Sequence, residues 1–460
     1  MSDPPMSDDR ENASAPEATP PRRFPRLPSW RDLTWTWAPA SERQAGEAIV
    51  RNFLLHWFPN KVAKRSLATS YSFWLGTLSA FLFLILTLTG AVLMFLYVPS
   101  VERAYASIKD LEYVVSFGRF LRAGHRIAAH LMVAVVFLHM VRVFLTGAYK
   151  NGVMANQNRP LNWWIGLLML VLTLLLSLTG YLLPWDQLAY WAVTVGTNIA
   201  RAVPLAGEAV SFFLLGGNEI NQNTLIRFYV LHCFFLPAAL GGLFVWHMWR
   251  IHKDGGLACR DRLALDQRAA AAAPVRAKTY SLLGITAGRT AAVEAALVDE
   301  DEHQVTSVPI LVRRLLLVGL VSFAVTALLA LALGAPLEEA ANPEVTPNPA
   351  KAPWYFLWLQ ELVTITTFRV GGFTVNGALV GGVVVPGLLL LAAFVVPYLD
   401  RSSARAVGVW LHRERRWLNL VFLVVCLVLL ALLAVGTFMR GPYWDFYWPW
   451  ETWPAHPEKL

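Results

Sequence analysis

Seven long apolar runs, separated by polar segments, dominate the pattern of hydrophobic positions along the chain. Each run is long enough to cross about 30 Å of hydrocarbon as an α-helix. The composition agrees, with 56% hydrophobic and 15% charged residues among 460. We therefore predict an all-α polytopic membrane protein, with a four-helix transmembrane bundle and three further transmembrane helices. The runs lie at residues 74–97, 127–148, 162–183, 229–250, 315–333, 377–399 and 417–438.

Polar segments divide the chain further. The N-terminal tail is rich in Pro, Ser and charge, and the middle of the chain carries Gly255-Gly256 and an alanine run at 269–273. At 41–58, apolar positions 48, 49, 53, 54 and 57 stand among charged ones, as in an amphipathic surface helix. Trp444, Trp448, Trp450 and Trp453 are typical of an interfacial aromatic belt. The predicted order is a disordered cytoplasmic tail (1–40), a surface helix and entry (41–70), a four-span domain (71–254), a cytoplasmic linker (255–310), a three-span domain (311–440) and an outside tail (441–460).

The distribution of Lys and Arg predicts the orientation. These residues gather before the first span, between spans two and three, between spans four and five, and at 401–416. The loops at 184–226 and 335–376 hold few of them. Because cytoplasmic loops carry the basic excess, we expect a cytoplasmic N-terminus and an outside C-terminus, in the cytoplasmic membrane of a bacterium. The net charge of +8 then reflects topology and not nucleic-acid binding.

Four histidines form two matched pairs, His125 with His139 and His232 with His247. Separations of 14 and 15 residues correspond to about 21–22 Å along one helix face. If the second and fourth spans lie side by side, His125 meets His232 near the outside and His139 meets His247 near the cytoplasm. Two stacked bis-histidine haems, held without covalent bonds, fit this pattern because neutral imidazole is a common axial ligand. We interpret the lone His130 as a packing or hydrogen-bonding residue.

Glycines in the first and third spans repeat the histidine interval. Gly76 and Gly90 are 14 residues apart, and so are Gly166 and Gly180. A flat macrocycle between helices needs close backbone approach, which glycine allows. Singly, each glycine is also explained as a small residue at a helix contact.

Charged and sulfur-containing residues complete the candidate chemistry. Guanidinium groups near the histidines either pair with haem propionates or are surface charges that snorkel; they are Arg122, Arg126 and Arg142. Cys233, Cys259 and Cys426 are scattered and form no CxxC. Neither an iron–sulfur cluster nor covalent haem c therefore finds its ligands here.

These residues together resemble cytochrome b of the quinol–cytochrome c reductase (cytochrome bc) family. The first half is similar to the short, chloroplast-type cytochrome b, and the second half to its separate subunit IV. The two appear fused in this chain. The resemblance covers roughly residues 42–254 and 311–440. It rests on Arg122-Ala-Gly-His125-Arg126, Gly180-Tyr-Leu-Leu-Pro184-Trp-Asp186-Gln187, Arg227-Phe-Tyr-Val-Leu-His232, His247, Asn342-Pro343 and Pro353-Trp354-Tyr355.

The resemblance implies an enzyme subunit that oxidises quinol with electron bifurcation at the outer side. One electron would go to a Rieske iron–sulfur protein and on to a cytochrome c subunit or soluble cytochrome c. The other would cross through the outer and inner b haems to a quinone near the cytoplasm, coupled to proton translocation. The family also implies a homodimeric complex in membrane lipid.

The resemblance implies that Pro184 to Gln187, including Asp186, and Pro353-Trp354-Tyr355 line the quinol pocket. The family's segment commonly reads PEWY, and its proton-accepting glutamate is missing here. Because proton exit needs a base, we take Glu361 as the candidate proton acceptor. Glu344 and Asp186 are the second choices. Glu361 is equally explained as an interfacial charge.

Two further positions differ among the family's branches. The chloroplast-type protein anchors an extra haem through a cysteine, and Trp74 stands at the matching position, so no covalent haem is expected. His252, followed by Lys253 and Asp254, matches a histidine that meets quinone at the inner site of the long, mitochondrial-type proteins. A helix-end cation favourable to the dipole is the alternative.

Two other function classes fit parts of the pattern. A di-haem membrane anchor of a quinone-linked dehydrogenase or hydrogenase would explain four histidines, but not the Pro-Trp-Tyr segment or the added three-span half. A transporter with proton-relaying histidines would hold no haem, and a visible spectrum would distinguish it.

Overall fold

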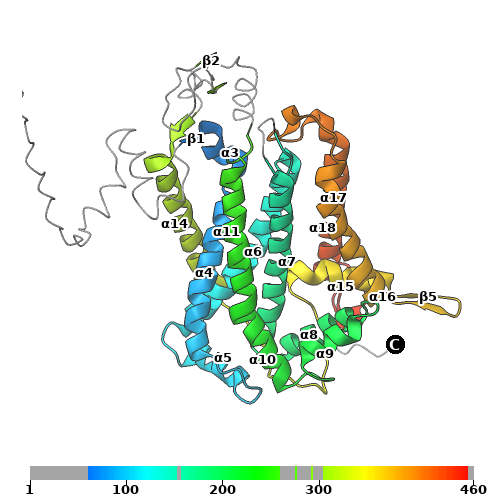
Figure 1. The fold of residues 1–460 in the computed structure, drawn as a ribbon. Helices are drawn as coiled ribbons and strands as arrows, with labels where there is room; N and C mark the ends of the chain where they lie inside the picture. The colour runs from blue at the N-terminus through cyan, green and yellow to red at the C-terminus, as the bar shows by residue number, and fades with distance from the viewer. Residues whose placement is uncertain (1–60, 153–156, 260–274, 277–291, 294–303, 454–460) are drawn as a thin grey trace, which may run out of the picture.

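The computed structural model describes residues 61–152, 157–259, 275–276, 292–293 and 304–453. The predicted tail at 1–40, the predicted surface helix at 41–58 and most of the linker lie outside these residues. Within the described part, seven helical segments are long and apolar enough to span a membrane, which confirms the predicted spans. The segments stand upright side by side in Figure 1. Their bounds are Leu75–Leu96, Gly118–Thr146, Arg159–Leu182, Gln222–Lys253, Ile310–Leu333, Gly377–Leu399 and Arg413–Phe438.

The first four spans form one bundle. α4 (Leu75–Leu96) packs along α6 (Gly118–Thr146), and α11 (Leu236–Lys253) packs along α7 (Arg159–Leu182). The two helices that carry the histidines, α6 and α11, make no extensive backbone contact with each other. They face each other across the bundle, which leaves the width that a flat group between their side chains requires.

The fourth span contains a wide turn at the first of its two histidines. After α10 (Gln222–Val230), a π-helical turn runs over Leu231–Phe235, and Pro237 follows at the start of α11. Because proline has no N–H to donate and its ring crowds the preceding turn, the chain widens there. The turn absorbs one extra residue after His232. This explains why the histidine interval is 15 residues here and 14 in α6.

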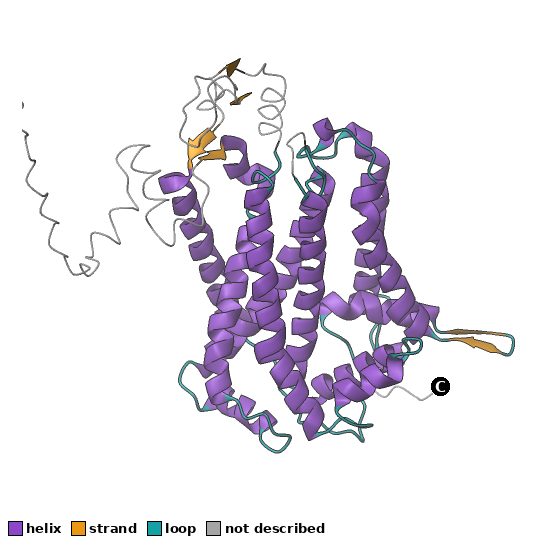
Figure 2. Ribbon diagram, in the orientation of Figure 1, coloured by secondary structure: helices purple, strands orange, loops and turns teal. Residues whose placement is uncertain are grey.

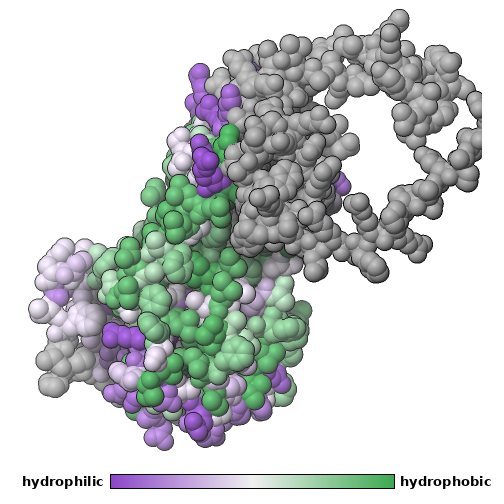
Figure 3. All heavy atoms as spheres, turned by 90° about the vertical axis from the view of Figure 1, so that its left-hand side faces the viewer, coloured by the Kyte–Doolittle hydropathy of each residue, from purple (hydrophilic) through white to green (hydrophobic). Residues whose placement is uncertain are grey.

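The second half adds α14 (Ser307–Leu333), which packs on α6 and α4, and α17 (Val385–Leu399), which packs on α7. α17 is preceded by α16 (Gly377–Leu379) and a π-helical turn at Val380–Val384. The last span is α18 (Arg416–Phe438). Large apolar side chains on the outer faces are exposed, as expected of a surface in contact with lipid; they include Leu88, Phe95, Leu316, Leu328 and Leu427. Figure 3 shows the apolar band on one face.

Short helices occupy segments that the sequence pattern alone placed in loops. They are α5 (Ala104–Tyr113), α8 (Gln187–Arg201), α9 (Gly207–Leu215) and α15 (Trp354–Thr366). All lie in the lower half of Figure 1. α8 begins where the Asp186 side chain accepts the Ala189 N–H at 2.9 Å, a typical N-cap. Val193 of α8 belongs to a buried apolar cluster that also contains Leu182 and Trp185.

Three antiparallel ribbons of two strands each are the exceptions to the all-α expectation in the described part (Figure 2). β1 (Lys61–Ala63) pairs with β4 (Gln304–Thr306), so the end of the linker lies beside the entry to the first span. β2 (Val275–Arg276) pairs with β3 (Ala292–Val293). β5 (Phe368–Val370) pairs with β6 (Phe373–Val375), and their register puts the apolar side chains on one face and Arg369 with Thr374 on the other. Short 3-10 and helical turns complete the fold at Lys64–Leu67, Thr69–Ser72, Ala404–Ala406, Arg413–Arg415 and Pro442–Trp444.

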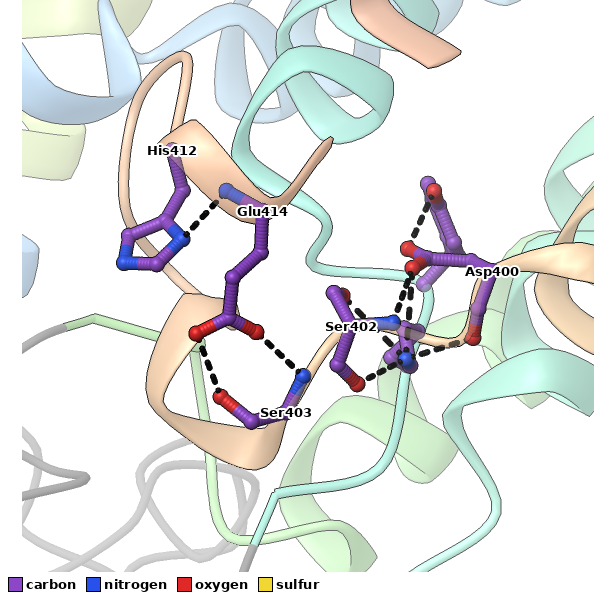
Figure 4. Close-up of polar contacts among 7 residues, drawn as sticks. Asp400, Ser402, Ser403, His412 and Glu414 are labelled. Atoms are coloured by element: carbon purple, nitrogen blue, oxygen red, sulfur yellow. Dashed lines mark hydrogen bonds and ion pairs between the residues drawn. The ribbon is translucent and has the colours of Figure 1, made fainter. Parts of the chain in front are cut away.

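A polar network joins the two halves at the end of the bundle predicted to be cytoplasmic (Figure 4). The Asp400 carboxylate accepts the hydroxyl of Tyr149 at 2.8 Å, and Lys150 donates to the Asp400 and Ser402 carbonyls at 2.6 and 2.5 Å. Beside it, Glu414 accepts the Ser403 N–H at 2.6 Å. The loop before α18 is thereby held against the loop after α6.

Arg415 strengthens the same junction. It is buried and donates to the Leu145 carbonyl at 2.5 Å, at the end of α6. Gly147 lies directly against this guanidinium, since an added Cβ would be 1.4 Å from Nη1, and its φ is +62°. Both conditions favour glycine at this position.

Candidate functional site

The outer histidine pair lies between α6 and the wide turn of the fourth span. The ring centroids of His125 and His232 are 6.2 Å apart. Nδ1 of His125 lies 2.9 Å from Thr89 Oγ1, and Nδ1 of His232 lies 3.0 Å from the Leu176 carbonyl and 3.3 Å from Thr179 Oγ1. When Nδ1 donates to such partners, the tautomer leaves Nε2 free to bind a metal. Both outer imidazoles can therefore present Nε2 to a metal.

Each of the four glycines faces a different histidine. An added Cβ at Gly90 would lie 3.1 Å from Cε1 of His125, and one at Gly180 would lie 2.4 Å from Cε1 of His232. At the other end, the corresponding distances are 3.2 Å from Gly76 to His139 and 3.7 Å from Gly166 to His247. The residues that recur at similar intervals in the sequence thus form two layers in the structure. Each layer contains two histidines and two glycines.

The inner layer also has features that suit a haem. Its histidines, His139 and His247, each lie against a glycine of the same layer. Three residues after His139 along α6, Arg142 is buried, and its Nε and Nη2 find no hydrogen-bond partner in the described part of the chain. Unpaired buried donors call for a ligand with acceptor atoms. A propionate at Arg142 would supply them.

A cavity of about 370 Å³ opens beside the outer layer. Its wall includes all four residues of that layer: Gly90, His125, Gly180 and His232. It also includes Pro184 and Asp186 from the turn after α7, and Tyr355 from α15. The cavity therefore joins the outer histidine pair to two motifs that are far apart in the sequence.

Hydrogen bonds hold the turn after α7 against the second half of the chain. Gln187 donates its backbone N–H to the Glu339 carbonyl at 2.9 Å, and its side chain accepts the Asn342 N–H at 2.8 Å. Ala341 donates to the Trp185 carbonyl at 3.1 Å. Trp185 has a φ of +54°, which makes the turn tight enough to bring Asp186 back to the cavity. The conformation of this turn therefore depends on hydrogen bonds from both halves of the chain.

Comparison with known proteins agrees with this arrangement. Residues 61–255 match the family described as cytochrome b/b6/petB, and residues 340–446 match cytochrome b (C-terminal)/b6/petD. Cytochrome b6 of Heliobacterium modesticaldum is 42% identical over 181 residues, which cover 39% of this chain and 82% of that protein. This chain belongs to the cytochrome b family. The match at both ends confirms the resemblance to a cytochrome b6 fused to a subunit IV.

Two other relatives extend the comparison. The menaquinol:cytochrome c reductase cytochrome b subunit of Geobacillus thermodenitrificans is 39% identical over 206 residues, covering 45% of this chain and 89% of that protein. A solved structure described as hyperthermophilic respiratory Complex III has the same fold, with a TM-score of 0.63 and 24% identity. The likeness covers 86% of this chain and 90% of that one. As a multi-pass membrane cytochrome b, the chain binds b-type haem.

The three arginines of this cytochrome b differ in the hydrogen bonds and ion pairs that they make. Arg122 is ion-paired with Glu112 and donates to the Ala335 and Pro336 carbonyls at 2.8 and 2.9 Å. Arg126 donates to the Pro336 carbonyl at 3.2 Å. Arg142 lies over the ring of Tyr71, with its Cζ 4.7 Å from the ring centroid. Unlike Arg122, Arg142 retains unpaired buried donors for a propionate.

The three carboxylates considered as proton acceptors have different surroundings. Asp186 lines the cavity. Burial raises the pKa of its carboxyl, and this effect outweighs the hydrogen bonds from the N–H groups of Ala189 and Glu338, which lower the pKa. Glu344 is exposed in the loop before α15 and does not line the cavity. Glu361 is 2% exposed and also lies outside the cavity wall. Arg440 holds both Glu361 oxygens, at 2.6 and 2.9 Å.

The Pro353-Trp354-Tyr355 segment begins α15, with Pro353 as its N-cap. Tyr355 is buried on the cavity wall, and burial raises its pKa to about 12, so the hydroxyl keeps its proton at neutral pH. Trp354 donates its indole N–H to Nδ1 of His130 at 2.9 Å. The sequence predicted a packing or hydrogen-bonding role for His130, and the bond it makes joins α6 to the Pro353-Trp354-Tyr355 segment.

The residues considered for the inner quinone site also differ in their surroundings. Asp254 is buried and accepts from Arg250 at 2.6 Å and from the Asn158 N–H at 2.9 Å. It is therefore already used as a structural residue at the end of α11. The ammonium of Lys253 lies 4.8 Å from the ring centroid of Trp249. His252, directly before Lys253 in the sequence, is partly exposed. Trp74 stands at the start of α4 with a φ of +54°.

The threonines before the two outer glycines were missed by sequence reasoning. Thr89-Gly90 and Thr179-Gly180 repeat the same dipeptide in two helices, and both hydroxyls reach histidine Nδ1 atoms. The repeated pair could have indicated this role. No comparable signal marked His130 or Glu338, which reach the cavity only because separate segments pack together.

Proposed function

We propose that this chain is the di-haem cytochrome b subunit of a quinol–cytochrome c reductase complex. One observation carries the proposal: the cavity that contains the outer histidine pair also contains the Pro184-to-Asp186 turn and Tyr355. A quinol in that cavity would lie within reach of an outer haem and of polar groups that bind its hydroxyls. The names of the relatives support the same activity.

In this proposal, His125 with His232 holds the outer haem and His139 with His247 the inner haem, both without covalent bonds. The bound haem irons accept and donate single electrons. The four glycines allow the flat groups to approach the helices, and Thr89 and Thr179 fix the tautomers of the outer imidazoles. Arg142, whose buried Nε and Nη2 have no partner in the described part of the chain, would pair with a propionate of the inner group.

At the outer cavity, the Tyr355 hydroxyl remains protonated and donates a hydrogen bond to the quinol oxygen. The apolar wall excludes water, and Asp186 and Arg126 provide polar contacts at its rim. With a haem held by His125 and His232, the oxidation would divide the two quinol electrons between that haem and a Rieske iron–sulfur protein, and both protons would leave outside. Near the cytoplasm, His252 contacts the quinone that the second electron reduces.

The proposal includes the setting of the complex. The N-terminus faces the cytoplasm and the C-terminus the outside of a bacterial cytoplasmic membrane, according to the basic residues of the loops. A cytochrome c subunit or soluble cytochrome c receives the electron from the iron–sulfur protein. The subunit works in a homodimeric complex.

Oxidant-induced reduction tests the proposal. Quinol is added to the purified complex with an inhibitor of the inner site, and ferricyanide is then added while the b-type absorbance is recorded. Bifurcation predicts that the oxidant increases haem reduction. Haem bands that do not respond would indicate a membrane anchor that passes electrons without bifurcation. A complex without b-type bands would contradict the proposal entirely.

A further inference from the structure

His130 lies on the cavity wall where the two halves of the chain meet. It comes from α6 and lines the cavity together with Asp186 and Tyr355. Its ring centroid is 5.7 Å from that of Tyr355, and its Nδ1 accepts the Trp354 indole N–H at 2.9 Å. One imidazole therefore contacts both aromatic residues of the Pro353-Trp354-Tyr355 segment.

Two donors converge on this imidazole, although it can accept from only one. Nε of Arg126 lies 3.4 Å from Nε2, and the Trp354 indole nitrogen lies 2.9 Å from Nδ1. A neutral imidazole has one N–H and one acceptor nitrogen. The shorter contact makes Nδ1 the acceptor. Because Trp354 is 37% exposed, its indole N–H can turn to water when another donor takes its place at Nδ1.

The other titratable and charged groups of the cavity are less suited to taking a proton from quinol. Tyr355 keeps its own proton, since burial raises its pKa to about 12. Both oxygens of Asp186 are already bonded, to the N–H groups of Ala189 and Glu338. Glu338 is exposed at the rim, where protons would leave. The remaining ionisable groups on this part of the wall are Arg122, Arg126 and Tyr181.

We propose that His130 is the proton acceptor for quinol oxidation, a role that rests on the function proposed above. The quinol hydroxyl replaces Trp354 at Nδ1, its O–H bond breaks, and the proton moves to the imidazole. The electrons pass one to the iron–sulfur protein and one to the haem of the outer site. The imidazolium faces Arg126, and repulsion between like charges favours release of its proton outside. The regenerated imidazole then accepts the second proton of the same quinol.

The first test is His130→Gln in the assembled complex. Loss of a general base lowers a rate about 100-fold or more, so quinol oxidation at neutral pH should fall by about that factor. Both b-type absorbance bands should stay unchanged. His412→Gln is the matched control, because His412 lies in the polar network that joins the two halves (Figure 4), and its Nδ1 accepts the Glu414 N–H at 3.3 Å. It should oxidise quinol at the unmodified rate.

Rescue distinguishes a catalytic role from a structural one. Pro353 stands where the family's segment commonly carries glutamate, so Pro353→Glu is added to His130→Gln. Turnover should recover, and the rising limb of the pH–rate profile should move to lower pH. The shift follows because a carboxyl ordinarily titrates about two pH units below an imidazole. A His130→Gln complex with both haems, full turnover and an unchanged pH profile would overturn the proposal.

A second measurement applies if His130 variants lose their haems. The structure of the unmodified complex with a hydroxylated quinol analogue should place one hydroxyl within hydrogen-bond distance of His130 Nδ1. An analogue bound in the cavity away from His130 would reject the role of His130 alone. An unmodified complex that fails to oxidise quinol would instead reject the proposed function.

Discussion

Gly180 and His232 face each other so closely that an added Cβ would lie 2.4 Å from the imidazole Cε1. No other glycine of the two layers is as crowded. The same distance is 3.1 Å at Gly90, 3.2 Å at Gly76 and 3.7 Å at Gly166. The four positions share a sequence interval but have different steric limits.

This gradient predicts graded effects of alanine. Gly180→Ala should remove most of the outer haem, because the methyl group displaces the ring of His232. Gly166→Ala should lose less haem, since its methyl group would lie at an ordinary contact distance of 3.7 Å from His247 and would restrict only the approach of the flat group. The ratio of haem to protein in the purified complex measures both. Equal losses in the two variants would contradict the steric explanation.

Removing a single imidazole should affect one layer only. His232→Ala takes away a ligand of the outer layer, and we expect about one haem per subunit instead of two. His139→Ala should remove the inner haem and spare the outer one. Redox titration of the b-type absorbance separates the two. Cys233→Ala, at the neighbouring position, is the control and should keep both. Loss of both haems in each histidine variant would indicate misfolding and not ligation.

Glu361 and Arg440 should contribute to stability. Glu361→Gln leaves a guanidinium without its carboxylate, and breaking a buried pair costs about 3–5 kcal/mol. The loss should fall at or below the lower end of that range, because Arg440 is 16% exposed. Thermal denaturation in detergent measures the shift, and the double change Glu361→Leu with Arg440→Met should restore most of it.

The same variant tests the alternative hypothesis that Glu361 accepts the quinol proton. With His130 as acceptor, the rate of quinol oxidation per folded Glu361→Gln complex should stay unchanged, as should its pH dependence. A slower rate with a shifted pH profile would favour Glu361.

Asp400 should make the junction between the halves sensitive to acid. Burial raises its pKa, but the Ser402 hydroxyl and N–H, the Tyr149 hydroxyl and the charge of Lys150 outweigh burial and hold the pKa below its ordinary value. A lowered pKa stabilises the fold above the unfolded-state value, about 3.9, and the contribution is lost as pH falls through the folded-state value. Asp400→Asn should lower the denaturation temperature at pH 7 and flatten its fall toward pH 3. Parallel curves for both proteins would argue against this role.

Sequence alone determined the seven spans and the two layers. The bilayer requires long apolar helices, and a repeated interval on a helix fixes which side chains share a level. The spacing of the histidines, with the predicted direction of the spans, was therefore enough to pair them. The glycine interval matched theirs, and the structure showed which glycine faces which histidine. The resemblance to cytochrome b rested on histidines of these layers together with segments such as Pro353-Trp354-Tyr355, and the family comparison confirmed it.

Tertiary structure decided what no local pattern encodes. The separation of α6 from α11, the partner of Glu361 and the bond from Trp354 to His130 all join distant segments; the last joins residues 224 positions apart. The short helices α5, α8, α9 and α15 were missed because their apolar faces are too brief to stand out beside the spans. Such contacts depend on how whole helices pack. The local sequence around a polar residue on a helix does not specify which distant segment will contact it.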